Sequence, residues 1–189
     1  EIVNGNNIGL IICGDGFDFS KCDKVSSFTS NAQSFENVTK NGITVDLTGM
    51  TSLINVTLLG TRDTWILPSK VKRAVVNASS TGDFSRCTEL TNVCINWQGS
   101  PYYENSLKTL GNAPLKEINI GFGNNDLSLL DKYLVKAKQT LTTIYMEGTG
   151  NSNFRRIKGT FESLKDFKNL EVIRGNGGAD SEILKGVEN

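Results

Sequence analysis

The sequence predicts an α/β solenoid, a stack of short parallel strands joined by irregular or helical return segments. Three observations favour this fold class. A short apolar pattern recurs along the chain, glycine and proline fall between its copies, and helical periodicity follows the later copies. A single strand with this pattern cannot bury its apolar face alone, whereas copies stacked side by side can.

The clearest copy of the pattern is Leu90-Thr91-Asn92-Val93-Cys94-Ile95, which has the form Leu-x-x-Val-x-Ile. Successive side chains of a strand point to opposite faces, so Val93 and Ile95 are expected in the core and the residues between them outside. The copies begin at residues 53, 71, 90, 115, 141 and 170, and these positions differ by 18, 19, 25, 26 and 29. Those differences lie in or near the period of about 20 to 29 residues that leucine-rich repeats show.

The repeating pattern divides the chain into three parts. Residues 42–175 are expected to form the leucine-rich-repeat-like solenoid, with a first strand at Ile43–Leu47. Residues 1–41 do not fit the pattern and are read either as an N-terminal cap or as an irregular small subdomain, and residues 176–189 as a C-terminal tail. Apolar residues at spacings of three and four predict a helix over 126–139, and Thr160 is placed to cap a shorter one.

The repeat resembles that of a known family. The series Phe84-x-x-Cys87-x-x-Leu90-x-x-Val93-x-Ile95 is similar to the repeat of the BspA-like bacterial surface proteins, whose leucine-rich units carry a Phe, then a small residue or Cys, then Leu-x-x-Val-x-Ile. The stretch from Phe161 to Ile173 also resembles the repeat of receptor L domains, a related solenoid and our second choice. The resemblance spans about residues 42–175. It implies a leucine-rich repeat protein of the cell surface with a role in adhesion.

Composition excludes several classes of function. The chain has 20 basic and 20 acidic residues and a formal net charge of zero, which disfavours nucleic acid as a partner. It contains no histidine, which removes Ser-His-Asp and Cys-His catalysis and histidine-ligated metals. The longest apolar stretch, Ile8–Cys13, is too short to cross a membrane. We therefore expect no enzyme activity, no cofactor and no membrane insertion.

The remaining polar motifs favour structural roles. Asp15 and Asp18 are too few for a calcium site and are read as a solvated turn. The four cysteines have no zinc-site spacing. Either Cys13 and Cys22 form a bond within the N-terminal segment or all four thiols are reduced. Cys87 is expected in the core, and Cys94 is expected to face out because it lies between two inward residues.

The outward face of the predicted sheet is the candidate binding surface, because stacked strands present a ladder of side chains about 4.8 Å apart. That face is also expected to carry Val75, Cys94, Thr143 and Val172. The candidate binding residues on it are Asn55, Thr57, Arg73, Asn92, Asn96, Glu117, Asn119, Tyr145, Glu147 and Arg174.

Two hypotheses about function follow. The first is a non-catalytic binding module, secreted or displayed at the cell surface, that engages a protein or glycan through its strand face. The alternative is a structural segment of a larger surface adhesin, surface layer or phage fibre. The chain starts at Glu1 rather than Met, so we expect an N-terminal segment to have been removed, either with a secretory signal or by ordinary trimming.

Overall fold

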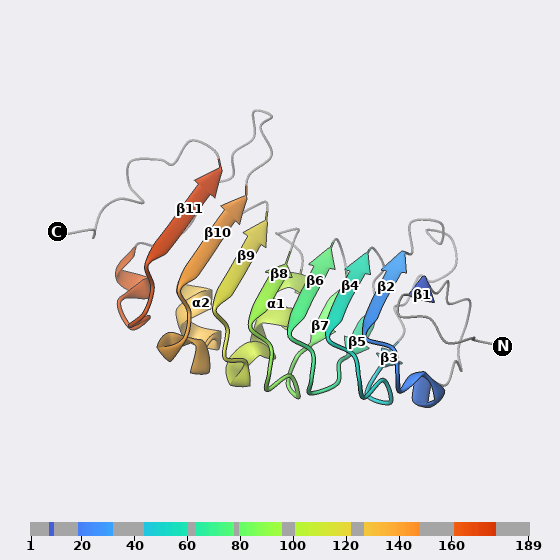
Figure 1. Cartoon of the computed structure of the whole chain (residues 1–189). Helices are drawn as coiled ribbons and strands as arrows, with labels where there is room; N and C mark the ends of the chain where they lie inside the picture. The colour runs from blue at the N-terminus through green and yellow to red at the C-terminus, as the bar shows by residue number, and fades with distance from the viewer. Residues whose placement is uncertain are drawn as a thin grey trace.

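The computed structural model of the chain describes residues 8–9, 19–31, 44–59, 63–77, 80–95, 101–121, 127–147 and 161–176. Within these ranges, eight strands form one parallel sheet (Figure 1). In spatial order they are β1 (Ile8–Gly9), β2 (Ser27–Asn31), β4 (Asn55–Leu59), β6 (Arg73–Asn77), β8 (Asn92–Ile95), β9 (Glu117–Gly121), β10 (Thr143–Glu147) and β11 (Val172–Asn176). The fold is therefore of the α/β class and is built on a parallel sheet.

The inward side chains of the large sheet form two rows, as the alternation in the sequence predicts. Strand register aligns one row across six strands, namely Val56, Ala74, Val93, Ile118, Ile144 and Ile173. The second row contains Leu58, Val76, Ile95, Ile120 and Met146. All of these residues are buried except Ile173, which is half-buried. The predicted inward direction of Val93 and Ile95 is confirmed, and each apolar strand face is covered by the return segments.

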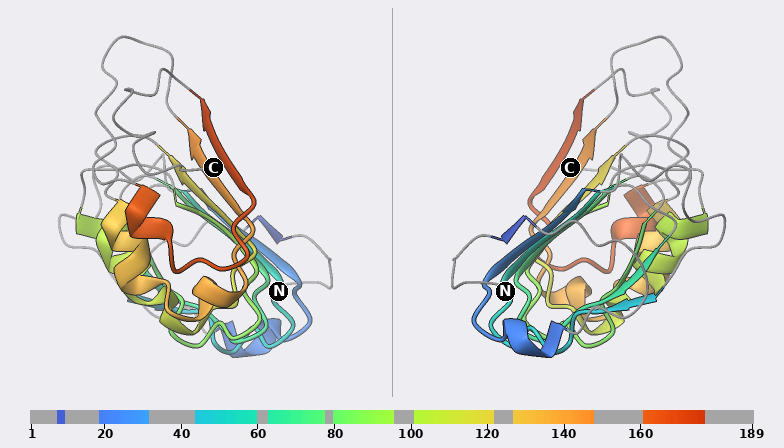
Figure 2. Two further views of the ribbon diagram at one scale, coloured as in Figure 1. Left: turned by 90° about the vertical axis from the view of Figure 1, so that its left-hand side faces the viewer. Right: turned by 90° about the vertical axis from the view of Figure 1, so that its right-hand side faces the viewer.

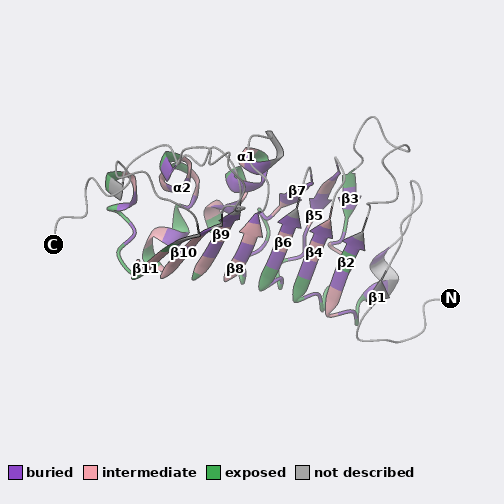
Figure 3. Cartoon of the chain, turned by 90° about the horizontal axis from the view of Figure 1, so that it is seen from above, coloured by how far each residue is buried: buried purple, intermediate pink, exposed green. Residues whose placement is uncertain are grey.

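The return segments make a second layer behind the large sheet (Figures 2 and 3). It begins with a parallel sheet of β3 (Thr44–Asp46), β5 (Thr64–Ile66) and β7 (Thr81–Asp83). Helix α1 (Pro101–Lys108) packs beside β7, and α2 (Leu127–Tyr133) packs beside α1 and the 3₁₀ helix η4 (Phe161–Leu164). The other 3₁₀ helices are η1 (Phe19–Cys22), η2 (Leu110–Asn112) and η3 (Lys136–Gln139). The hydrophobic core lies between the two layers.

The structure differs from the sequence expectations in three places. The expected first repeat strand at Ile43–Leu47 appears as β3, which belongs to the small sheet. Strands β1 and β2 fall within the residues expected to form a cap, yet they continue the large sheet. The predicted helix over 126–139 is present as two pieces, α2 and η3, and Thr160 lies outside the described residues.

A row of backbone carbonyls aligns the strands just before they enter the large sheet. The carbonyl oxygen of Lys72 accepts hydrogen bonds from the backbone N–H groups of Thr91 and Asn92, at 3.0 and 3.1 Å. The same double acceptance recurs at the preceding and following turns, at Ser26, Ile54, Thr91, Lys116 and Thr142. Each turn is thereby tied to the next by backbone atoms. The hydroxyls of Thr91 and Thr142 add hydrogen bonds to the Lys72 and Lys116 carbonyls, at 3.3 and 3.0 Å.

Aromatic side chains join the N-terminal strands to the small sheet. Phe28 on β2 contacts Phe19 edge to face, with ring centroids 5.8 Å apart, and Trp65 on β5 at 5.7 Å. All three rings are buried. Aromatic pairs in this geometry add about 0.5–1.5 kcal/mol to the stabilisation from burial alone. This cluster extends the core into the segment that the repeat pattern does not cover.

The turn before β8 contains Phe84, Cys87 and Leu90, which belong to the stretch that resembles the BspA-like repeat. Phe84, Cys87 and Leu90 are fully buried, and the backbone N–H of Cys87 donates to the Phe84 carbonyl at 2.9 Å. The Cys87 thiol donates to the Pro68 carbonyl of the previous turn at 3.4 Å. Burial, reinforced by the nearby Asp83 carboxylate, raises the pKa of the Cys87 thiol to about 12. Cys87 is therefore a neutral core residue, as expected from the sequence.

Candidate functional site: the outward face of the large sheet

Strand register arranges the outward side chains in parallel rows. The first row runs across the strands near their beginnings and contains Ser27, Asn55, Arg73, Asn92, Glu117, Thr143 and Val172. The second row lies two residues further along each strand and contains Thr29, Thr57, Val75, Cys94, Asn119, Tyr145 and Arg174. The rows bring together candidate residues that are far apart in the sequence.

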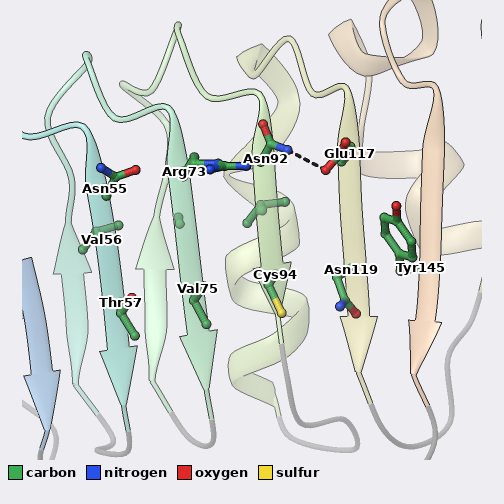
Figure 4. Close-up of a pocket in the computed structure, with 12 residues that line it drawn as sticks. Asn55, Val56, Thr57, Arg73, Val75, Asn92, Cys94, Glu117, Asn119 and Tyr145 are labelled. Atoms are coloured by element: carbon green, nitrogen blue, oxygen red, sulfur yellow. Dashed lines mark hydrogen bonds between the residues drawn. The ribbon is translucent and has the colours of Figure 1, made fainter. Parts of the chain in front are cut away.

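A shallow groove with a volume of about 430 Å³ lies on this face (Figure 4). It crosses β4, β6, β8, β9 and β10. Its outward lining residues are Asn55, Thr57, Arg73, Val75, Asn92, Cys94, Glu117, Asn119 and Tyr145, with Val56, Ala74 and Val93 beneath them. Small-molecule sites in proteins have volumes of about 300–1,000 Å³, so the groove is large enough for a small ligand or for one part of a larger one.

A hydrogen bond between neighbouring strands fixes one wall of the groove. The side-chain amide of Asn92 donates to a carboxylate oxygen of Glu117 at 2.6 Å (Figure 4). The Asn92 amide oxygen accepts from the hydroxyl of Thr91 at 2.8 Å. Both the nitrogen and the oxygen of the Asn92 amide therefore have hydrogen-bond partners. Glu117 is the single carboxylate among the described lining residues, and this bond engages it.

Arg73 contributes a positive charge to the groove. It occupies the first row between Asn55 and Asn92, and its side chain extends towards Asn92 in Figure 4. Arg73 is exposed and makes no ion pair with a described residue. Lys72, the residue before it, does pair with Glu89, at 3.7 Å. The Arg73 guanidinium is therefore available to a ligand.

The opposite end of the groove is aromatic. Tyr145 on β10 lines the groove, and Arg174 lies beside it in the same row on β11. The Arg174 guanidinium carbon is 6.0 Å from the centre of the Tyr145 ring, within the range of a cation–π contact. Arg174 is exposed and forms no ion pair within the described residues. This end combines a ring face with a second cation.

The side-chain amide oxygen of Asn119 has no hydrogen-bond partner in the described part of the chain. This oxygen is buried. An unpaired buried acceptor costs about 1–3 kcal/mol. The atom lies in the second row between Cys94 and Tyr145, and neighbouring atoms cover it. The amide oxygen is therefore enclosed in the face, although Asn119 itself lines the groove.

Seven of the ten predicted candidate residues line the groove. Of the other three, Arg174 is beside it, Asn96 is outside the described residues, and only the backbone of Glu147 is described. Val75 and Cys94 line the groove although neither is among the candidates. The alternation places both on this face, and no signal in the sequence marks them further because the Val75 side chain is apolar and the Cys94 thiol is only weakly polar. The role of all these residues in binding stays a prediction.

The described ranges contain neither a metal-binding cluster nor a helix that could span a membrane. No group of three or more cysteine and acidic residues there is arranged to hold a metal ion. No helix in those ranges combines the length and the apolar character that crossing a membrane requires. Cys22 and Cys87 are both buried, and Cys13 is outside the described residues, so the proposed bond between Cys13 and Cys22 stays untested.

Comparison of the chain with protein-family models, with curated proteins and with solved structures finds no significant match.

Proposed function

We propose that the chain is a non-catalytic binding module, secreted or displayed at the cell surface, that engages a protein or glycan through its strand face. The observation that carries the proposal is the groove, because it is lined by outward residues of five neighbouring strands. Extended, regularly spaced faces of this kind are the usual binding surfaces of stacked-repeat proteins. We further propose that the fold is a leucine-rich-repeat-type solenoid of the kind found in BspA-like surface proteins.

The chemistry of the groove supports binding rather than catalysis. Catalysis by a pair of carboxylates requires two of them near one reacting bond. The described lining offers Glu117 alone, and Asn92 engages its carboxylate. The other polar lining groups are amides, a hydroxyl, a guanidinium and a phenol, which are suited to orienting a ligand. A shallow surface with this composition favours recognition.

The backbone arrangement supports the same proposal. The strands are held in register by the carbonyls before each strand and by the apolar rows behind them. The outward residues are therefore presented on a frame whose register the backbone bonds and the apolar rows set. Rigid presentation lowers the entropy lost when a ligand binds.

Capture from arrays of extracellular proteins and of glycans tests this proposal. The blocking variant is Thr57→Trp, which places a large side chain on the groove lining at a strand position that tolerates aromatic residues. The matched control is Thr88→Trp, at an exposed turn position before β8 that is outside the lining. Circular dichroism and thermal unfolding verify that both variants fold.

We expect the wild-type chain and Thr88→Trp to capture the same array component, and Thr57→Trp to bind it at least about tenfold more weakly. Equal capture by all three proteins would place binding elsewhere on the molecule. The proposal would also be overturned if no component were captured and the chain converted a small substrate instead.

A further inference from the structure

The groove has an uneven distribution of charge that narrows the class of ligand. On the described outward face, Arg73 and Arg174 have no carboxylate partner, whereas the carboxylate of Glu117 is engaged by Asn92. The two arginines are on β6 and β11, which are four strand spacings apart, or roughly 19 Å at about 4.8 Å per strand. The side chains described on this face therefore include two arginines without a carboxylate partner and one carboxylate, that of Glu117.

The neutral lining groups are suited to hydroxyls. Asn55 and Asn119 carry amides, each with two N–H donors and one acceptor oxygen, and Thr57 adds a hydroxyl. A sugar hydroxyl both donates and accepts, so it matches such groups without leaving either side unpaired. Tyr145 offers a ring against which the apolar face of a sugar can pack.

The groove is less suited to a folded protein partner. Protein interfaces draw most of their energy from large apolar or aromatic anchors in deep, well-packed pockets. The groove is shallow, and the large apolar residues exposed in the described chain are Ile54, 38 % exposed, and Val135, 63 % exposed. Neither of them lines the groove. The lining combines hydrogen-bonding groups with small aliphatic side chains, and its one large aromatic side chain is that of Tyr145, a combination that favours a glycan.

We propose that the groove binds an acidic oligosaccharide, with a sugar carboxylate paired to Arg73 and a sugar ring packed on Tyr145. This inference rests on the proposed function and specifies its ligand. The planar guanidinium of an arginine can donate two parallel hydrogen bonds to one carboxylate. Such charge-assisted hydrogen bonds are among the stronger hydrogen bonds in proteins. An acidic oligosaccharide carries carboxylates and many hydroxyls on one chain. It can therefore contact the Arg73 guanidinium, the asparagine amides of the lining and the Tyr145 ring at the same time. Arg174 adds attraction at the far end.

Isothermal titration with matched sugars tests the inference. The probes are a hyaluronan tetrasaccharide, a trigalacturonate and sialyllactose, each compared with the neutral form in which its carboxyl groups are reduced to alcohols. We expect at least one acidic probe to bind about tenfold or more tightly than its neutral form. Arg73→Gln is expected to abolish that difference. Arg86→Gln is the matched control, because Arg86 is exposed at a turn and does not line the groove.

The outcomes separate this inference from the proposed function. If neutral and acidic forms bind equally, or if Arg73→Gln and Arg86→Gln have equal effects, the carboxylate assignment is wrong while binding at the face stands. If no acidic probe binds and Thr57→Trp abolishes capture of a protein from the array, the inference fails and the proposed function stands. If Thr57→Trp has no effect on any captured component, both fail.

Discussion

The side-chain amide of Asn92 donates a 2.6 Å hydrogen bond to the carboxylate of Glu117 on the neighbouring strand. The two residues are directly opposite each other in the register of β8 and β9, and both line the groove. The bond therefore has two roles. It joins two strands across the outward face, and it engages the single carboxylate among the described lining residues. Asn92 lies between that carboxylate and Arg73 in the row.

The first prediction concerns the strength of this bond. Asn92→Ala is expected to lower the free energy of unfolding by about 1 kcal/mol, because cross-strand pairs and half-exposed hydrogen bonds contribute on that scale. Urea denaturation followed by circular dichroism measures the change. Glu117→Ala and the double variant complete the cycle and give the coupling energy between the side chains. Strictly additive effects would show that the bond does not form in solution.

The second prediction compares two glycines. A Cβ added at Gly82 would lie 2.5 Å from Cζ and 2.7 Å from Cε2 of the buried Phe84 ring, so Gly82→Ala is expected to destabilise the chain by about 1–3 kcal/mol. Within the described ranges, a Cβ at Gly111 would meet only the Tyr133 carbonyl oxygen, at 3.6 Å. Gly111→Ala is therefore expected to be neutral or slightly stabilising. Thermal unfolding measures both, and equal melting temperatures would contradict the packing at Phe84.

Much of the large sheet could be predicted from the sequence, because its apolar residues alternate. Leu90, Val93 and Ile95 have the spacing that a strand with one buried face requires, and the structure buries all three. The same alternation placed Asn92 and Cys94 on the outward face. What it could not show is the bond from Asn92 to Glu117, because that contact joins residues 25 positions apart.

The strand at β3 was predicted, but β5, β7 and α1 were missed because their local signals are weak. Strand β7 consists of Thr81, Gly82 and Asp83, which have no apolar alternation, and its burial results from packing against α1. Strand β2 has Ser30 in the inward row where β4 has Leu58. That serine is buried and its hydroxyl accepts a hydrogen bond from the backbone N–H of Leu59, so tertiary contacts replace the missing apolar side chain.

The third prediction concerns pH. The raised pKa of the Cys87 thiol, about 12 against an ordinary 9.0, means that the unfolded chain releases this proton at lower pH than the folded chain. The contribution of Cys87 to stability is therefore complete below pH 9 and falls by about 1.4 kcal/mol per pH unit above it, up to the folded pKa.

Urea denaturation of the wild-type chain and of Cys87→Ala between pH 8 and about pH 10.5 measures this effect. Lysine and tyrosine titrations are common to both proteins, so the difference between the two unfolding free energies isolates Cys87. We expect that difference to shrink as the pH rises above 9. A difference that stays constant with pH would show that the thiol is not buried as described.

The most direct measurement of the central claim, that the outward face is the binding surface, is the rate at which a small maleimide alkylates Cys94. Cys94 is half-buried and lines the groove, whereas Cys87 is fully buried. A Cys94→Ser variant identifies which alkylated peptide in the mass spectra contains Cys94. With the array component captured by the wild-type chain present at saturation, we predict that alkylation of Cys94 slows at least tenfold. An unchanged rate in the presence of that bound component would contradict the claim.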